Sequence, residues 1–562
     1  MTQGSRISEA EALQAYEDAA QFRPWLKLHG AATVPPRDAA TALDLFRAAS
    51  PEAPALFYFD RVLSYAAVDG LSDHLAGWLA ARGVGAGDRV ALILQNTPQF
   101  VIATVATWKL GAIVVGLNPM YRSAELQKLF ADCTPRAVIC HGDQWQSVVE
   151  AAAKVAADCV LWTSGRDFQS RNEPRVLPQD TDAPACASLA RVLAEPALPY
   201  QAGAISPDDV GLLLYTSGTT GLPKGAMLTH RNLVHNARLS AALLALGPQS
   251  RIFGVAPLFH VTGFELQLLA AFAAGASQIL TYRFQPAVVL DAFLEHRPTF
   301  IVGAITAFIA LMNHPDTTTQ HFASFDRIYS GGAPIAPAVV EAFAERFGRA
   351  IRSSYGMTEL TAPSHLAPAD GPIPVDPQSG ALSIGIPTPG TDVIVVDDDR
   401  RPLGPGEHGE VVVRGPTVMA GYWGKPAETG EVKVGGWMHT GDIGFFDAEG
   451  WFYLVDRKKD MISASGFKVW PREVEDVLYA FPGVREAAVV GAPDAYRGET
   501  VIAFVSPQPG AALDADALKA FCREKLAAYK CPARIDILPE LPKTASGKIT
   551  RNVLKDELRP PR

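Results

Sequence analysis

The stretch YTSGTTGLPKG, Tyr215–Gly225, puts three glycines, three threonines, a serine and a lysine into one short loop. Side chains this small and hydroxylated do not build a core. We therefore expect the loop to bring backbone N–H groups, hydroxyls and one ammonium close to a phosphate. An ordinary P-loop is not indicated, because Pro223 and Gly225 stand where that motif has glycine and a hydroxyl residue. Taken alone, the loop is also compatible with an exposed Gly/Ser turn.

The bulk composition indicates a large folded protein of several lobes. The chain has 562 residues, of which 48% are hydrophobic and 19% charged. It is too long for one core and too apolar for a disordered chain. Its net charge of −9 lacks the basic excess of nucleic-acid-binding proteins, so we expect no nucleic-acid partner. Oligomeric state stays open, with a homodimer as one alternative.

The sequence predicts a cytoplasmic protein without a transmembrane segment. Its acidic N-terminal stretch lacks the apolar run of a signal peptide. The most apolar segment, Phe300–Met312, has thirteen residues and falls short of the roughly 20 that span a bilayer. We expect it to be a buried strand and helix. The cysteines and histidines show neither C-x-x-C nor H-E-x-x-H spacing, so no disulfide framework or zinc site is indicated.

Strand and helix patterns alternate through much of the chain. From Gly87 the order is strand, helix, strand, helix, strand, and a second run from Asp209 to Phe347 alternates in the same way. Ser123 and Thr229 are the predicted N-caps of two of these helices. The alternation predicts two α/β subdomains with mostly parallel sheets.

The pattern changes after about residue 380. Short alternating strands between Pro, Gly and Asp turns predict a distorted antiparallel barrel as far as Leu454. The last hundred or so residues hold two helical patterns beside strand-like segments, which predicts a small mobile α+β domain. The predicted fold class is α/β, with a large N-terminal domain over residues 1–458 and the small domain over residues 459–562. Between the two α/β runs, Arg166–Tyr200 is expected to be exposed and irregular.

Six further motifs accompany the glycine-rich loop. They are SGGAP (Ser330–Pro334), SYGMTE (Ser354–Glu359), TGD (Thr440–Asp442), DRKKD (Asp456–Asp460), SGFKVWPREVE (Ser465–Glu475) and PKTASGKI (Pro542–Ile549). In this order and spacing the seven motifs resemble the adenylate-forming superfamily, in particular its acyl-CoA synthetase branch of fatty-acid/AMP-binding ligases. The resemblance covers nearly the whole chain from about residue 40 onward.

The resemblance implies a nucleotide site in the large domain. Asp442 would accept both ribose hydroxyls, and Tyr355 would lie against adenine. Thr358 and Glu359 would hold the α-phosphate and Mg²⁺, a cation that prefers oxygen ligands, with Thr216 as a second metal ligand. Without the resemblance, Asp442 would be interpreted as a turn residue and Tyr355 as a core aromatic. The remaining implied nucleotide-binding residues are Ser217, Gly218, Thr219, Thr220, Lys224, Gly331, Gly332, Ala333, Gly356 and Arg457.

The resemblance also gives the small domain a catalytic lysine. Lys548 would bridge the substrate carboxylate and the α-phosphate, and a contact of this kind is worth roughly 3 to 4 kcal/mol in rate. Lys459 matches the family's hinge position, and Gly466 matches the small residue that lines the pantetheine tunnel. One departure is Asp456, which stands where glycine is common before Arg457. By themselves these residues would be a surface lysine, a linker charge and a turn glycine.

The implied reaction activates a carboxylic acid in two steps. The carboxylate first attacks the α-phosphate of ATP and gives acyl-AMP and pyrophosphate, while Mg²⁺ and Lys548 reduce the repulsion between the two anions. The thiol of coenzyme A then attacks the acyl carbon, after the small domain has rotated Lys548 away. The implied partners are therefore a small-molecule acid, ATP and coenzyme A.

The acid is expected to be uncharged beyond its carboxylate. Ile252–Thr281 and Thr299–Phe325 contribute to the expected acyl pocket and contain no Lys or Arg, so a dicarboxylic acid would lack a cationic partner there. The segment after Pro257 also lacks the Phe-Asp pair with which amino-acid-activating relatives anchor an ammonium. His260 is either a catalytic residue beside the carboxylate or a satisfied structural histidine. Small residues such as Gly263 leave room for an alkyl chain.

The string SGFKVWPREVE (Ser465–Glu475) resembles that of medium- and long-chain fatty acyl ligases more than that of aryl ones, and together with these features it favours a medium- or long-chain fatty acid. Three alternatives stay open: an aryl-acid ligase of the cinnamate or benzoate type, an acyl-AMP ligase that loads a carrier protein, and a non-catalytic protein that binds acyl-adenylate or acyl-CoA. An intact set of polar residues argues against the non-catalytic alternative, because a decayed enzyme has no reason to keep it. This set is Lys224, Glu359, Asp442, Arg457 and Lys548.

Overall fold

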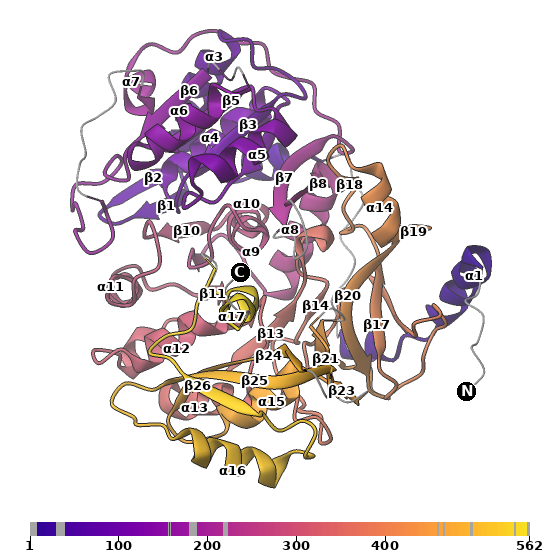
Figure 1. Cartoon of the computed structure of the whole chain (residues 1–562). Helices are drawn as coiled ribbons and strands as arrows, with labels where there is room; N and C mark the ends of the chain where they lie inside the picture. The colour runs from indigo at the N-terminus through magenta and orange to yellow at the C-terminus, as the bar shows by residue number, and fades with distance from the viewer. Residues whose placement is uncertain are drawn as a thin grey trace.

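The computed structural model describes residues 8–29, 40–155, 157, 159–178, 188–216, 223–457, 460–464, 467–494, 498–544 and 547–558. Figure 1 shows an α/β lobe at the top, a second α/β lobe below it, an antiparallel sheet beside the second lobe, and the C-terminal domain at the bottom. We call everything before the C-terminal domain the large domain. Within the described residues no helix is both long and apolar enough to cross a bilayer. The predicted α/β class is confirmed.

Sheet A forms the middle of the large domain. Its strand order is β15–β14–β13–β12–β11–β9–β10–β1–β2, and each pairing from β13 to β1 is parallel. The parallel strands are short and apolar, as expected for a sheet that is covered on both faces. Their bounds are β1 (Pro54–Tyr58), β2 (Arg61–Ser64), β9 (Arg251–Phe253), β10 (Ser277–Leu280), β11 (Phe300–Gly303), β12 (Arg327–Gly331), β13 (Ile351–Tyr355), β14 (His365–Leu366) and β15 (Ile386–Pro387).

Sheet B forms the upper lobe in Figure 1. Its order is β18–β8–β7–β4–β3–β5–β6, parallel from β7 to β6 and antiparallel where β8 and β18 join. Two mostly parallel sheets are therefore present as predicted, but the first strand of the second run, β7, joins the sheet of the first run beside β4. The strand bounds are β3 (Arg89–Ile93), β4 (Ile113–Gly116), β5 (Ala137–His141), β6 (Cys159–Thr163), β7 (Val210–Thr216), β8 (Lys224–Thr229) and β18 (Gly421–Tyr422).

The remaining sheets lie in the last third of the chain. The predicted antiparallel segment is confirmed as β16–β17–β20–β19, with β21 paired to β20. The C-terminal domain has the order β23–β22–β25–β24, with β26 parallel to β25. The bounds are β16 (Asp392–Val396), β17 (Gly409–Arg414), β19 (Lys433–Val434), β20 (Trp437–Phe446), β21 (Phe452–Arg457), β22 (Ile462–Ala464), β23 (Phe467–Val469), β24 (Val484–Asp494), β25 (Gly498–Pro507) and β26 (Arg534–Ile537).

Helices cover both faces of sheet A. One core joins the sheet to α11, α12 and α13, and another joins its opposite face to α8, η3 and α10. These two layers leave the carboxyl ends of the parallel strands as the edge where loops gather. The bounds of the longer helices are α3 (Tyr65–Ala80), α4 (Pro98–Lys109), α5 (Ser123–Cys133), α6 (Trp145–Ala152), α8 (His230–Leu243), η3 (Phe264–Leu269), α10 (Ala270–Ala274), α11 (Pro286–His296), α12 (Ile305–Asn313), α13 (Pro337–Phe347), α15 (Pro471–Tyr479), α16 (Ala515–Lys525) and α17 (Arg551–Glu557).

Several local predictions can be compared with these elements. Phe300–Met312 is a buried strand and helix, β11 and α12, as predicted. Thr229 caps α8, because its hydroxyl accepts a hydrogen bond from the Asn232 backbone at 3.2 Å. Ser123 does not cap α5: the cap lies one residue earlier, where the Arg122 backbone N–H donates to the Glu125 carboxylate at 2.9 Å.

The prediction of an exposed, irregular stretch at Arg166–Tyr200 was wrong for one short part of the described residues. The segment contains the short helix α7 (Leu189–Ala194), capped by Ser188, and its Leu189 and Val192 are buried. Apolar residues on one face of a helix pack against a neighbour even when the surrounding sequence is rich in turn formers. The sequence prediction also missed α17, which follows the lysine-bearing motif directly.

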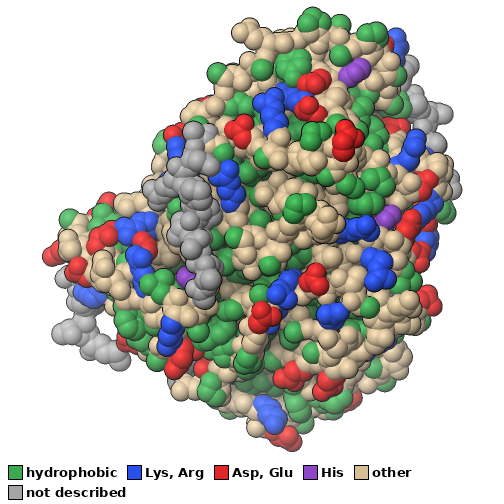
Figure 2. All heavy atoms as spheres, turned by 180° about the vertical axis from the view of Figure 1, so that it is seen from behind, with side chains coloured by type: hydrophobic (Ala, Val, Ile, Leu, Met, Phe, Trp, Pro, Cys, Tyr) green, Lys and Arg blue, Asp and Glu red, His purple; other side chains and the backbone are tan. Residues whose placement is uncertain are grey.

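The face shown in Figure 2 mixes charged side chains of both signs. Lys and Arg side chains are interspersed with Asp and Glu side chains and with hydrophobic ones, and no broad basic patch covers the described part of this face. This distribution agrees with the net charge of −9.

Candidate active site

The candidate site lies at the carboxyl edge of sheet A, where it meets the antiparallel sheet. Tyr355 is the last residue of β13, and Asp442 lies in β20. The Tyr355 hydroxyl donates a 2.7 Å hydrogen bond to Oδ2 of Asp442. Both residues are buried, with 8% and 7% of their surfaces exposed. The structure therefore joins the predicted adenine- and ribose-binding side chains across two sheets.

Glu359 follows Tyr355 along the chain and lies in the short helix η5 (Thr358–Leu360). The Tyr422 hydroxyl donates to Oε1 of Glu359 at 2.9 Å, and the Lys224 ammonium lies 5.0 Å from the centre of the Tyr422 ring. Burial and the neighbouring Glu359 carboxylate raise the pKa of Tyr422, so its hydroxyl stays protonated and donates. Tyr422 thus connects the predicted metal ligand with the lysine of the glycine-rich loop.

Glycines at the ends of β12 and β13 allow other groups to approach the backbone. A Cβ on Gly331 would lie 2.4 Å from Ser354 Oγ, and one on Gly356 would lie 3.0 Å from the Cα atoms of Ala362 and Pro363. Gly332 is exposed, with φ +76°, and the neighbouring Ala333 is half-buried. Packing therefore requires small residues at Gly331 and Gly356. At Gly332, the space that a side chain would fill is occupied by a group from another domain.

That group is Lys548. A Cβ on Gly332 would lie 2.9 Å from Lys548 Cε and 3.3 Å from its Nζ. The adjoining residue is fixed by a hydrogen bond between domains, in which Thr306 Oγ1 donates to the Gly547 carbonyl at 2.7 Å. Thr544 supports the loop from within, because its hydroxyl accepts from the Lys548 backbone N–H at 3.1 Å. The structure therefore holds the Lys548 ammonium at the carboxyl edge of sheet A.

His260 lies next to this ammonium and is neutral. Burial and the positive charge of Lys548 lower the pKa of His260 to about 3. Its Nδ1 accepts a hydrogen bond from the Thr262 backbone at 3.3 Å and caps the short helix α9 (Val261–Gly263). The two roles left open for His260 thus coexist in the geometry: the ring caps a helix and also borders the site.

Several predicted residues fall wholly or partly outside the described part of the chain. Thr216 ends β7 opposite Lys224, and its hydroxyl is 3.4 Å from the Lys224 carbonyl. Arg457 pairs with Asp442 in the antiparallel register, although only its backbone is described. The predictions for Ser217, Gly218, Thr219, Thr220, Lys459 and Gly466 lie outside the described residues, as does the boundary predicted between residues 458 and 459.

The residues present fit a Mg²⁺ ion held partly by substrate. Among the described residues no three His, Cys, Asp or Glu side chains form a metal-binding cluster. Mg²⁺ in nucleotide sites uses one or two carboxylates together with phosphate oxygens and water, so it needs no such cluster. Glu359 supplies a buried carboxylate, and Thr216 supplies a hydroxyl at the end of β7.

Sequence reasoning missed two contributors to this geometry. Tyr422 lies in a Gly/Pro-rich stretch, where a lone tyrosine carries no signal for a bond to Glu359, which is 63 positions away. Thr306 lies in an apolar segment, and its bond to Gly547 spans 241 positions. Neither contact has a local pattern, because both depend on how separate elements are packed.

A model of the family described as AMP-binding enzyme matches residues 44–423, and a model of the AMP-binding enzyme C-terminal domain matches residues 473–548. The chain belongs to the AMP-binding enzyme family. A long-chain-fatty-acid–CoA ligase of Bacillus subtilis is 36% identical over 523 residues, which cover 90% of this chain and 92% of that protein. A feruloyl-CoA synthase of an Amycolatopsis species is 36% identical over 513 residues, covering 91% of this chain and 96% of that protein.

The solved structures agree with this assignment. ATP-bound MatB from Rhodopseudomonas palustris superposes with a TM-score of 0.83 at 29% identity and covers 92% of this chain and 99% of that one. The resemblance to the adenylate-forming acyl-CoA synthetases is confirmed. This member of the family is an ATP-dependent acyl-CoA ligase, so the non-catalytic alternative is set aside.

Proposed function

We propose that the enzyme activates a medium- or long-chain fatty acid to acyl-AMP and then transfers the acyl group to coenzyme A. The observation that carries the first step is the position of Lys548 at Gly332, beside neutral His260. A fixed ammonium there would attract the carboxylate and offset charge on the α-phosphate as the new bond forms. Neutral His260 adds no second positive charge, so Lys548 supplies the cation.

The nucleotide would be held by the large domain. Asp442 is suited to the ribose hydroxyls and Tyr355 to the adenine face, while Lys224 would bind the phosphates. Glu359 and Thr216 would hold Mg²⁺, which when bound offsets negative charge on the phosphates. Tyr422 would orient the Glu359 carboxylate through its hydrogen bond.

A fatty acid is favoured by the charge of the expected acyl pocket. Ile252–Thr281 and Thr299–Phe325 contain no Lys or Arg. Glu265, in η3, is fully buried, and burial raises its pKa well above the ordinary value. A second charged group on the acid would therefore find no Lys or Arg partner in these segments, whereas an alkyl chain needs none. The long-chain-fatty-acid–CoA ligase relative supports the same class.

One buried side chain favours a second candidate, a hydroxylated aryl acid. Gln267 is fully buried, and its Nε2 donates to the Val302 carbonyl at 2.7 Å. The pairing between β9 and β11 ends at Ile301, so the Val302 carbonyl lies just beyond it. Gln267 Oε1 has no hydrogen-bond partner within the described chain. A hydroxyl on the substrate would satisfy this acceptor, and the relative named feruloyl-CoA synthase supports the same class.

A panel of acids separates the two candidates. Pyrophosphate release is measured with saturated fatty acids of graded length, cinnamate, 4-hydroxycinnamate and benzoate, each with and without coenzyme A. We expect the highest kcat/KM with a fatty acid and thioester formation with free coenzyme A. A preference for 4-hydroxycinnamate over cinnamate by about tenfold or more would overturn the fatty-acid proposal. Pyrophosphate release that turns over only with a carrier protein would contradict coenzyme A as the acceptor.

The variant Gln267→Leu tests the second candidate directly. If Gln267 binds a substrate hydroxyl, the substitution lowers kcat/KM for 4-hydroxycinnamate by roughly tenfold and leaves cinnamate unchanged. An equal effect on both acids, or on neither, contradicts that role. Gln14→Leu, on the exposed part of α1 (Glu9–Ala19), is the matched control, because its amide donates to Asp18 within the same helix.

A further inference from the structure

Asp456 joins the large domain to the C-terminal domain close to the candidate site. It is the penultimate residue of β21 and pairs with Ile443, next to the Asp442–Arg457 pair. Opposed residues in an antiparallel pair share a face and successive residues alternate, so Asp456 and Asp442 point to opposite faces. The Asp456 side chain is nearly inaccessible to solvent, with 4% of its surface exposed. A buried carboxylate of this kind needs partners, and it finds them across the domain boundary.

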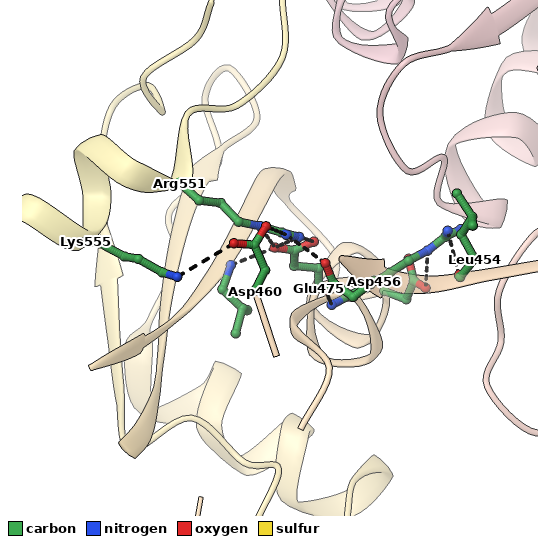
Figure 3. A network of polar contacts seen from close by, with 9 residues as sticks. Leu454, Asp456, Asp460, Glu475, Arg551 and Lys555 are labelled. Carbon is green, nitrogen blue, oxygen red and sulfur yellow. Dashed lines mark hydrogen bonds and ion pairs between the residues drawn. The ribbon is translucent and has the colours of Figure 1, made fainter. Parts of the chain in front are cut away.

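Two helices of the C-terminal domain bind this carboxylate (Figure 3). Nη1 of Arg551, in α17, donates to Oδ1 at 3.0 Å, and the backbone N–H of Arg472, in α15, donates to Oδ2 at 3.0 Å. Arg472 makes a further contact with the same strand, because its Nη1 donates to the Leu454 carbonyl at 3.0 Å. Three contacts therefore connect the end of β21 with α15 and α17.

Arg551 is itself held rigidly inside the C-terminal domain. Its Nη2 donates to both oxygens of Glu475, at 2.9 and 2.8 Å, and its Nη1 lies 3.4 Å from Asp460. Glu475 in turn accepts from the Val489 backbone at 2.7 Å. Burial lowers the pKa of Arg551, but Glu475 and Asp456 outweigh it and raise the pKa overall, so the group stays charged. The guanidinium is therefore a fixed feature of the domain, and Asp456 is the partner on the large domain.

The segment that carries Arg551 also carries Lys548, three positions earlier. The same segment contacts Thr306 through Gly547 and approaches Gly332 through the Lys548 side chain. A rotation that withdraws Lys548 from Gly332 also separates Arg551 from Asp456, because one rigid domain carries both. After separation Arg551 keeps Glu475, whereas Asp456 loses its guanidinium.

We propose that Asp456 is a positioning residue for the first half-reaction. Its carboxylate docks α15 and α17 in the one orientation that places Lys548 at Gly332, and its release accompanies the second half-reaction. The proposal rests on the role proposed above for Lys548 in acyl-AMP formation. It also accounts for the aspartate at a position where the resemblance to the family led us to expect glycine.

The test measures the two half-reactions separately in Asp456→Asn, which keeps the shape and removes the charge. We expect acid-dependent ATP/pyrophosphate exchange to fall by about 10- to 100-fold, the size of a lost hydrogen bond between charged groups. Thioester formation from supplied acyl-AMP should be unchanged or faster. Asp456→Glu restores the charge and should recover part of the exchange rate. Equal loss of both half-reactions, or an unchanged ratio, would overturn the proposal.

Asp460→Asn is the matched control. Asp460 contacts the same guanidinium at 3.4 Å, but it lies on the C-terminal side of the predicted hinge. Its substitution should therefore alter the two half-reactions to the same small extent, about threefold or less. A selective loss of exchange in Asp460→Asn would mean that the charge of Arg551, and not its contact with the large domain, matters.

A second measurement does not depend on turnover. Hydrogen–deuterium exchange in the enzyme without substrates reports on the Arg472 backbone N–H, which donates to Asp456. We expect faster exchange of the peptide containing Arg472 in Asp456→Asn, with no change in peptides of β24 and β25. Faster exchange throughout the domain would indicate loss of folding and overturn the docking role. If no acid supports pyrophosphate release in the wild-type enzyme, the proposed function fails while this measurement still tests Asp456.

Discussion

Tyr355 and Asp442 meet inside the large domain through a buried 2.7 Å hydrogen bond between two sheets, whereas Lys548 reaches the same site on a half-buried loop of another domain. The first contact is part of a packed core and stays in place without help from another domain. The second depends on a few polar contacts, such as Thr306 to Gly547. The difference suggests that the nucleotide half of the site is preformed, while the cation is delivered and withdrawn.

Removing the delivered group should have the largest effect. Lys548→Ala is expected to lower acid-dependent ATP/pyrophosphate exchange by about 10²- to 10³-fold, because the ammonium is lost where charge develops. Thioester formation from supplied acyl-AMP should be largely retained. The two rates are measured by isotope exchange and by single-turnover thioester assay. Parallel loss of both would mean that Lys548 is not confined to the first step.

Filling the space beside Gly332, which the Lys548 side chain occupies, should give the next largest effect. In Gly332→Ala the new Cβ would lie 2.9 Å from Lys548 Cε, and alanine at φ +76° costs about 1 kcal/mol or more. We expect exchange to fall by roughly 10- to 100-fold while the second step continues.

The control for this variant is Gly348→Ala. Gly348 has φ +64°, and a Cβ added there would have no atom of the described residues within 4 Å. Alanine at this position therefore carries the backbone cost without touching Lys548. Similar loss of exchange in both glycine variants would attribute the effect to backbone strain alone.

Weakening the preformed nucleotide half of the site should have a smaller effect. It should slow both half-reactions and not the first one alone. Tyr422→Phe removes the hydroxyl that donates to Glu359 at 2.9 Å. A hydrogen bond to a charged group is worth about 1.5 to 3 kcal/mol, so we expect a rise of roughly tenfold or more in the KM for Mg·ATP, measured by steady-state kinetics. Tyr58→Phe, whose buried hydroxyl bonds to the Gly165 carbonyl, should change stability without changing this KM.

The smallest effect concerns stability at the domain boundary. Burial raises the pKa of Asp476 to about 7, while the nearby Arg472 opposes the shift. The group therefore binds its proton more tightly in the folded state, and its contribution to stability is lost as pH rises from about 4 to about 7. Glu475 and Asp456 carry further negative charge near this group.

Asp476→Asn should flatten this dependence. Between pH 5 and pH 8 we expect the variant to lose about 2 kcal/mol less unfolding free energy than the wild type, measured by denaturant titration. Asp536→Asn, whose half-buried carboxylate pairs with the exposed Arg534, should leave the slope as it is. An identical slope in the wild type and Asp476→Asn would show that Asp476 is ionised throughout this range.

The sequence predicted best where a local period or motif carries the information. The alternation from Gly87 onward predicted β3, β4 and β5 with the helices between them, and the second alternating run ends at Phe347, the last residue of α13. It failed where tertiary contacts override composition. Val192 is buried in α7 within a segment predicted to be exposed and irregular.

The site shows the same division. Tyr355 and Gly331 end strands of sheet A and Glu359 follows them closely, whereas Lys224 and Thr216 lie in sheet B and Asp442 lies in the antiparallel sheet. Their mutual contacts could not be predicted, because a bond such as Tyr422 to Glu359 links elements that no sequence period relates. The unpaired Oε1 of Gln267 was likewise not predicted, because its segment was assessed only for the absence of Lys and Arg.

The sequence by itself determined the chemical inventory: a hydroxyl- and glycine-rich loop, an aspartate after a turn glycine, and a lysine in the last motif. Backbone freedom and side-chain chemistry are local properties, so a string of residues can specify them. Only the tertiary structure decided that Lys548 lies against Gly332 and that Asp456 meets Arg551. Those distances depend on how two separately folded domains dock, and docking is set by the packing and charge of surfaces assembled from distant parts of the chain.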